Sequence, residues 1–265
     1  MLHLLKVEWL KLKHYRTFWI LGVLYIISNY GVSYIGYLIY RDVSKEVGKN
    51  GIAKAIIGPS AFAFPEVWPT VTWLCGLLLF IPALLVIISV TNEFSYKTHR
   101  QNIVDGWSRR QFISVKLIMV LIISIVSTII VFLTSMIFGW QEGSSLSFEK
   151  IEFVGYFFIQ ALSYCTLALL FSLLLKRSGL AIGVYFLYIF VLENLLGGLL
   201  GKQIENAGHY LPLNSTDSLI PFPFLRKATH NYIYQPDYSI LLPLAAAYLL
   251  VYIVFSVRRY QTDDL

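Results

Sequence analysis

The sequence predicts an all-α membrane protein with six transmembrane helices, preceded by an N-terminal amphipathic helix. Hydrophobic residues make up 57% of the 265 residues and charged residues only 14%, whereas soluble domains are roughly 45–50% apolar and about 25% charged. The apolar residues form long continuous runs instead of the alternating pattern of a membrane β-barrel. Lys and Arg gather between these runs. The excess apolar side chains are therefore expected to face lipid.

The first sixteen residues have the pattern of a basic amphipathic helix. Leu2, Leu5, Trp9 and Leu12 recur at helical spacing, and lysines lie between them. Such a helix lies along a membrane surface, with its apolar side toward the acyl chains. The alternative is a simple positively charged flank that fixes the orientation of the first span.

Six runs are long enough to cross about 30 Å of hydrocarbon, which takes roughly 20 apolar residues in a helix. The first run, at about 23 residues, exceeds the apolar stretch of a cleaved signal peptide, and no A-x-A site follows it. The predicted spans are residues 18–40, 68–91, 112–139, 151–175, 179–200 and 238–257. We interpret residues 1–265 as a single transmembrane domain.

The distribution of basic residues predicts the orientation of these spans. If the N-terminus is cytoplasmic, the inside segments hold 13 of the 21 Lys and Arg residues and the longer outside segments hold 8. Both termini are therefore expected inside. Residues 201–237 then form a long external loop, in which the apolar residues 219–225 are either a re-entrant element or part of a plain surface loop.

The loop at residues 92–111, predicted to be cytoplasmic, mixes aromatic and aliphatic side chains with charges. Tyr96, Arg100 and Ile103 have the i, i+4, i+7 spacing of one helix face, and Asp105-Gly106 is a turn signal. Exposed aromatic and arginine side chains are typical of a protein docking surface. A helix that lies under the bilayer is the alternative.

This loop resembles the coupling-helix region of ABC-2 type permeases, the membrane subunits of a class of bacterial ABC transporters. The matching residues, in order and spacing, are Glu93, Thr98, Ser108-Arg109 and Lys116. The departures are Lys97, where glycine is common, and Gly106, where proline is common. The motif covers about a fifth of the chain, and the six-span layout covers all of it. Residues 64–68 and 91–112 resemble the version found in Bacteroidetes-like bacteria.

The resemblance implies that the loop sits in a groove on a separate ATPase, present in two copies, which binds ATP and Mg. It also implies a second permease subunit, the same or related, and a bacterial cytoplasmic (inner) membrane location. Glu93 and Arg100 would form ion pairs with the ATPase, and Trp107 would anchor the loop. The candidate coupling residues are Glu93, Tyr96, Lys97, Thr98, Arg100, Ile103, Asp105, Trp107, Ser108 and Arg109.

The chain is not expected to bind a nucleotide or to be an enzyme. A P-loop requires G-x-x-x-x-G-K-[ST], and the nearest segment, residues 197–203, lacks both the spacing and the hydroxyl residue. No Asp or His lies inside a predicted span, which disfavours an intramembrane enzyme. The scattered histidines predict no metal site, and the basic clusters flank apolar runs instead of forming a nucleic-acid-binding face. The two cysteines, Cys75 and Cys165, lie within apolar runs and are expected to be buried.

A few polar residues lie within the predicted spans. Because polar groups are costly in lipid, they are candidates for a substrate path or a helix interface. They are Asn29, Gln160, Glu193 and Asn194. For Glu193, the alternative is an earlier helix end that lets its carboxylate reach water. The function predicted is a permease that exports a substrate, and the alternative is a non-catalytic membrane scaffold that binds a cytoplasmic partner through residues 92–111.

Overall fold

The structure is a computed structural model that describes residues 2–47, 61–104, 106–203, 206–223 and 236–262. These residues form a helical bundle, and no strand occurs among them. The all-α prediction is confirmed. The segments at residues 48–60 and 224–235, which were predicted to be external, lie outside the described residues, as does Asp105.

The long helices follow the predicted spans. Most extend beyond the predicted apolar core into polar flanks, because a helix does not have to end where the hydropathy falls, whereas α8 keeps nearly the predicted bounds. The helices at these positions are α2 (Arg16–Val47), α4 (Val67–Gly76) with α5 (Phe80–Ser95), α7 (Arg109–Gln141), α8 (Glu152–Leu175), α9 (Ser178–Phe186) with α10 (Glu193–Gln203), and α13 (Tyr238–Thr262).

The second predicted span is broken. Among the described residues, five helical stretches are long and apolar enough to cross a membrane, and α4 with α5, bent by 43° at the break, makes a sixth if the pair counts as one span. Pro82 lies just after the break. Its ring clashes with the carbonyl four residues earlier in a continuous helix, which accounts for the interruption between Gly76 and Phe80.

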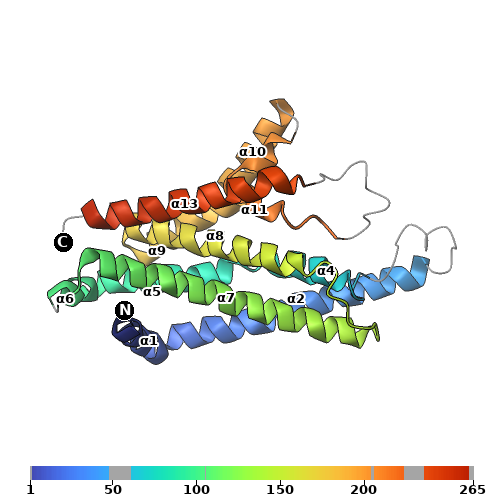
Figure 1. The fold of residues 1–265 in the computed structure, drawn as a ribbon, viewed down its shortest axis with the longest axis horizontal. Helices are drawn as coiled ribbons and strands as arrows, with labels where there is room; N and C mark the ends of the chain where they lie inside the picture. Colours follow the sequence, from blue (N-terminus) through green and yellow to red (C-terminus); the bar gives the residue numbers. More distant parts are fainter. Residues whose placement is uncertain (1, 48–60, 105, 204–205, 224–235, 263–265) are drawn as a thin grey trace.

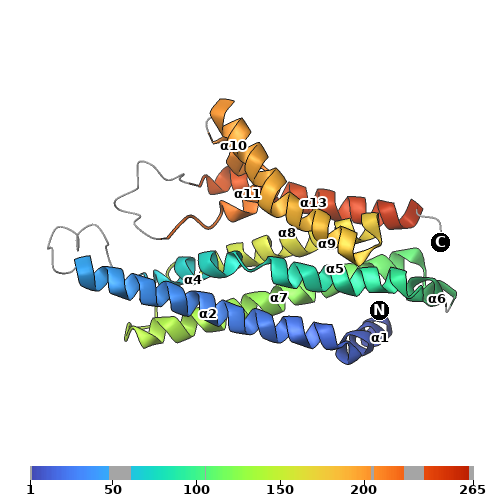
Figure 2. The ribbon, with the colours of Figure 1, turned by 180° about the vertical axis from the view of Figure 1, so that it is seen from behind.

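The two ends of the bundle differ. At one end lie both chain termini, the separate N-terminal helix α1 (Leu2–His14), and the short helix α6 (Thr98–Val104) between α5 and α7 (Figure 1). We call this the α6 end. The turn after α7 lies at the opposite end (Figures 1 and 2). Helix α10 stands away from the bundle in both views.

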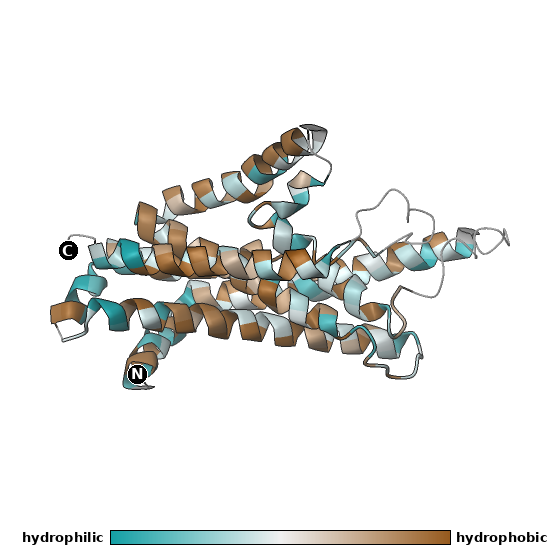
Figure 3. Ribbon diagram, turned by 45° about the horizontal axis from the view of Figure 1, so that its top comes forward, coloured by the Kyte–Doolittle hydropathy of each residue, from teal (hydrophilic) through white to brown (hydrophobic). Residues whose placement is uncertain are grey.

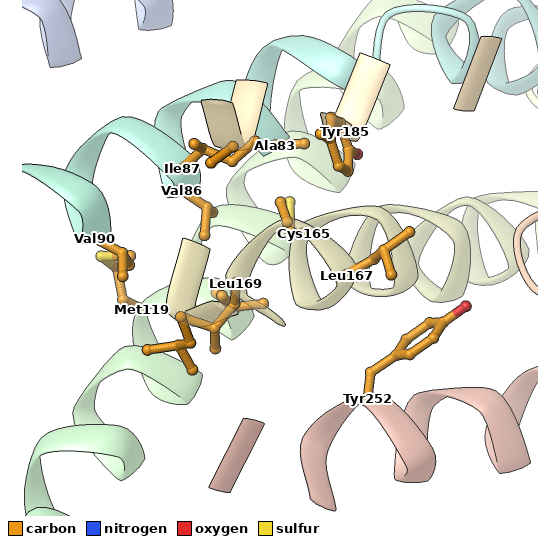
Figure 4. Close-up of a cluster of buried hydrophobic side chains, with 14 of the residues drawn as sticks. Ala83, Val86, Ile87, Val90, Met119, Cys165, Leu167, Leu169, Tyr185 and Tyr252 are labelled. Atoms are coloured by element: carbon orange, nitrogen blue, oxygen red, sulfur yellow. The ribbon is translucent and has the colours of Figure 1, made fainter. Parts of the chain in front are cut away.

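Helix α8 is the centre of the core and packs against α5, α7 and α13. Its buried small residues allow this close packing, and Cys165 and Ala168 are fully buried. Figure 4 shows Cys165 of α8 lying between Val86 and Ile87 of α5 and Tyr185 of α9, all members of one buried cluster. Cys75 is buried in a second cluster toward the opposite end. Both cysteines are therefore buried, as predicted.

The outer faces of the long helices are apolar. Helix α2 is the least buried of the long helices, with exposed Ile20 and Ile27 along its length. Figure 3 shows hydrophobic colour along the long helices and hydrophilic colour toward the α6 end. A soluble protein would not expose such continuous apolar surface, so the bundle is a membrane protein.

Candidate functional site

The α6 end contains a network of four charged side chains, of which Glu8, Glu93 and Lys116 are buried and Lys11 is partly exposed. Lys116, near the start of α7, is fully buried and bonds Glu8 of α1, and its Nζ lies 3.0 Å from Glu93 Oε1 at the end of α5. Lys11 Nζ approaches the same Glu93 oxygen at 3.0 Å and Glu8 Oε2 at 3.7 Å. Two ammonium groups thus neutralise two carboxylates. Charges can be buried in this way only when they are paired.

The network extends into α6. Lys11 Nζ donates to Asn102 Oδ1 at 3.4 Å and lies 5.9 Å from the centre of the Trp107 ring. His99 is buried, with its Nδ1 3.0 Å from the Glu93 carbonyl oxygen. Thr98 Oγ1 donates weakly to the same carbonyl at 3.4 Å. One face of α6 is therefore attached to α1 and α5.

The other face of α6 and the turn before it project from the bundle. Tyr96 is 75% exposed and Val104 is 85% exposed, the highest values among the large apolar side chains of the described residues. Lys97 and Arg100 are also exposed, and Ile103 is half-buried. We call Tyr96, Lys97, Arg100 and Val104 the α6 tip. Exposed apolar and aromatic groups beside cations suit contact with another protein.

The structure changes several of the predicted residue roles. Helix α6 begins at Thr98, after the α5 C-cap at Tyr96, so Tyr96 does not share a helix face with Arg100 and Ile103. Glu93 is 6% exposed and is occupied by two lysines, so an ion pair with an ATPase does not fit its surroundings. Trp107 is half-buried against the core and anchors the loop internally.

The last predicted coupling residues belong to the start of α7. Ser108 forms a capping box with Gln111, which satisfies the free amides at the helix start. Arg109 Nη1 donates to the Gln261 carbonyl at 2.6 Å and so attaches α7 to the end of α13. Asp105 lies outside the described residues, and no role is assigned to it.

The backbone angles at Lys97 and Gly106 bear on the two residues that depart from the ABC-2 pattern. Lys97 has a φ of 58°, a left-handed conformation that favours glycine, so a glycine would adopt this position with less strain than lysine. Gly106 has a φ of 97°. Proline, with its φ fixed near −65°, cannot adopt that angle. The turn after α6 therefore differs in conformation from one that carries proline there.

A second polar site lies toward the opposite end, next to a π-helical turn at Leu187–Leu192. Ala181 and Tyr185 are the buried positions of α9, and α-helical spacing would place Leu192 on the same stripe. Instead Leu192 is 41% exposed and Glu193 is 2% exposed. The wider π turn shifts the register by one residue, which directs Glu193 inward.

Glu193 holds the segment that follows α10 against the bundle. Its Oε1 accepts the backbone N–H groups of Leu213 and Asn214, the latter at 2.8 Å, at the start of α11 (Asn214–Asp217). Nearby, Gly208 of the 3₁₀ turn Ala207–Tyr210 packs on Gly197 of α10, and a Cβ on Gly208 would lie 2.8 Å from the Gly197 carbonyl oxygen. This contact accepts only glycine without rearrangement.

Segment 211–220 returns into the bundle. Leu219 and Ile220 are buried against the bundle, whereas residues 224–225 of the predicted re-entrant segment lie outside the described residues. Asp217 accepts a hydrogen bond from Gln160 Nε2 at 2.8 Å and one from the Tyr164 hydroxyl at 3.0 Å, both from α8. Burial raises the pKa of Asp217 to about 6, although both hydrogen bonds oppose the shift.

Asp217 also lines a pocket of about 590 Å³. The pocket combines hydrogen-bonding groups with an aromatic wall in which Trp73 and Phe222 meet edge to face at 5.0 Å. His209, whose Nδ1 lies 2.9 Å from Ser218 Oγ, borders it, and burial lowers the pKa of His209. The polar lining residues are Asn194, His209, Asn214, Asp217 and Ser218. Such a mixed pocket can bind a small amphipathic molecule.

Three of the four polar residues predicted within the spans meet around this segment. Gln160 bonds Asp217, Glu193 bonds the start of α11, and Asn194 lines the pocket. Asn29 lies elsewhere, fully buried, with its Nδ2 donating to the Tyr25 carbonyl at 2.7 Å. Sequence reasoning missed Asp217 and His209 because they belong to a loop without helical or motif spacing. The four prolines of that loop, which restrict its backbone, were the available sign that it adopts an ordered structure.

The chain belongs to a family described as "Protein of unknown function (DUF2705)", whose sequence pattern matches residues 56–265. No curated protein matches the chain. The matched region contains α6, the network residues Glu93 and Lys116, and the pocket around Asp217, but it excludes α1.

Proposed function

We propose that this member of the DUF2705 family is the permease subunit of an ATP-driven transporter of the ABC-2 type. In this proposal, two copies of a separate cytoplasmic ATPase bind ATP and Mg and act on a pair of permease subunits, the same or related. The chain spans the bacterial cytoplasmic membrane with both termini inside, and it exports its substrate. The proposal rests on the resemblance at residues 91–116 and on the way the α6 tip is mounted.

The observation that carries the proposal is the attachment of an exposed tip to a rigid base. Tyr96 and Val104 project at the α6 end, while His99 and Asn102 on the other face are buried. The network joins that buried face to α1, α5 and α7 through Glu93, Lys11 and Lys116. A force applied at the tip would therefore move three helices together instead of bending a loop.

Transport requires that ATPase closure favour one arrangement of the spans over another. The break between α4 and α5 separates the segment attached to α6 from the segment packed near the opposite end. We expect α5 to move with α6 and to tilt at this break. The pocket at Asp217 would contact the substrate at the opposite end, where Trp73 of α4 forms part of its wall.

The test is purification of the tagged full-length chain from its native membrane, followed by identification of bound proteins. The variant Arg100→Glu with Val104→Asp places two negative charges on the α6 tip, where both side chains are exposed. Arg258→Glu is the matched control, because Arg258 is exposed near the C-terminal end of α13 and outside α6. Each variant must elute as wild type on size exclusion.

We expect a P-loop protein with ATPase activity to bind wild type and Arg258→Glu and to be lost from the double variant. Absence of any such protein from wild type, or its equal retention by the double variant, would refute the proposal. Retention through α6 of a protein that lacks a P-loop would assign the chain the scaffold function instead.

A further inference from the structure

A separate apolar groove lies between α1, α2, α5 and α7 and has a volume of about 380 Å³. Among the described residues that line it, Glu8 alone carries a charge, and it is paired with Lys116. The other lining side chains are almost all aliphatic or aromatic, for example Leu12, Phe18 and Met119. A water molecule needs two to four polar partners. The groove is therefore suited to a hydrocarbon chain.

The position of the groove points to a lipid of the bilayer. It extends from α1, at the α6 end, along the first half of α2 to residues 119–130 in the middle of α7. Trp9 and Trp19 line it and are each about half exposed. The Trp19 indole N–H donates to the Lys13 carbonyl at 2.9 Å. Tryptophans in such positions mark the boundary between headgroups and acyl chains.

The charge beside the groove selects the headgroup. Lys6, Lys13 and Arg16 are exposed on α1 and at the start of α2. Between residues 3 and 40 the only acidic side chain is Glu8, which is buried. This surface carries uncompensated positive charge, and it complements a phosphate that bears a net negative charge.

We propose that the groove binds one acyl chain of an anionic bilayer phospholipid, whose phosphate lies against the basic residues of α1. The bound acyl chain would fill the space between α1 and the bundle and so hold α1 where its Glu8 pairs with Lys116 of α7. This inference does not depend on the permease function, because lipid binding requires neither an ATPase nor a transported substrate.

The test compares two glycines of α2. Gly22 lines the groove, Gly31 does not, and a Cβ at either position meets no atom within 4 Å. Leucine can therefore be introduced at both positions without backbone strain, but only Gly22→Leu fills the groove. The full-length chain is incubated with phosphatidylglycerol or phosphatidylcholine of identical acyl chains, washed in mild detergent, and its retained lipid measured by native mass spectrometry.

Wild type and Gly31→Leu are expected to retain phosphatidylglycerol. Gly22→Leu is expected to retain roughly 15- to 60-fold less, since it displaces two or three methylene groups of the acyl chain from the groove. Equal retention by the two leucine variants would overturn the groove assignment. Equal retention of the two lipids by wild type would overturn the anionic headgroup.

A second pair of variants on α7 keeps the test decisive if Gly22→Leu does not fold. Val126 lines the groove, whereas its neighbour Ile125, which is similarly exposed, does not. Val126→Trp should lower lipid retention, and Ile125→Trp should leave it unchanged. The reverse result would refute the proposal.

Discussion

Replacing Lys116 with methionine tests whether the α6 end depends on the buried charge network. Methionine keeps the length and apolar stem of the lysine side chain but removes its ammonium group. Lys116 is fully buried, and its Nζ contacts both Glu8 and Glu93. After the substitution, two buried carboxylates face each other, with only Lys11 beside them.

The expected loss of stability is large. Removing one partner of a buried ion pair typically costs about 3–5 kcal/mol, because the remaining charge is buried without compensation. Lys116 is bonded to two carboxylates, but Lys11, which is 31% exposed at its side chain, still neutralises part of the charge. We therefore expect Lys116→Met to lower the free energy of unfolding by about 3 kcal/mol.

The assay is equilibrium unfolding of the purified chain in mixed detergent micelles, followed by tryptophan fluorescence. The double variant Glu93→Gln with Lys116→Met removes one charge of each sign and should recover at least about 1 kcal/mol relative to Lys116→Met. Lys13→Met, at an exposed lysine of α1, is the control and should change stability by less than about 0.5 kcal/mol.

Hydrogen exchange locates the effect. In Lys116→Met, amide exchange should accelerate in α1 and α6, which the network joins, while α8 remains protected at the centre of the core. A loss below about 1 kcal/mol, or a double variant no more stable than Lys116→Met, would refute the argument that these four charges hold the α6 end together.

Three further results are expected. Gly208→Ala should lower the free energy of unfolding by about 1–3 kcal/mol, because the added Cβ would lie 2.8 Å from the Gly197 carbonyl oxygen. Gly198→Ala, whose Cβ would meet no atom within 4 Å, should have little effect, and equal effects of the two variants in thermal unfolding would contradict the close contact. In the folded chain the pKa of Asp217 is about 6, above its ordinary value of 3.8, so the protonated carboxyl stabilises the fold at low pH. As the pH rises from 4 to 6, wild type should therefore lose up to roughly 2–3 kcal/mol of stability relative to Asp217→Asn. If the two proteins keep the same difference in stability across that range, the raised pKa of Asp217 is excluded. Lys97→Gly should stabilise the chain by at most about 1 kcal/mol by relieving a left-handed φ of 58°, and destabilisation in a melting experiment would argue against that backbone angle.

The spans were predictable because lipid imposes a local rule on each of them. A helix that crosses the hydrocarbon needs an uninterrupted apolar run, and such runs are visible without knowledge of neighbouring segments. The run at residues 151–175 became α8 with nearly the same bounds. The break within residues 68–91 was missed, although Gly76 and Pro82 were visible, because proline is tolerated in many membrane helices.

The polar sites were only partly predictable. The cost of polar groups in lipid singled out Gln160, Glu193 and Asn194, and these residues do meet around segment 211–220. That cost could not reveal Asp217, which lies in a loop, or the one-residue shift of the π turn that directs Glu193 inward. In the loop at residues 92–111, helical spacing placed Tyr96 and Arg100 on one face, but a left-handed residue between them ended the helix.

The helical class, the apolar spans and the basic character of α1 follow from the sequence alone, because each depends on the composition of one continuous segment in contact with solvent or lipid. The tertiary structure decided which charges meet. Glu8, Glu93 and Lys116 come from three helices, and 85 and 23 residues separate them along the chain. Considered within its own segment, Glu93 seems free to bind a partner protein. In the fold it is neutralised by Lys11 and Lys116, because electrostatic pairing depends on distance in space.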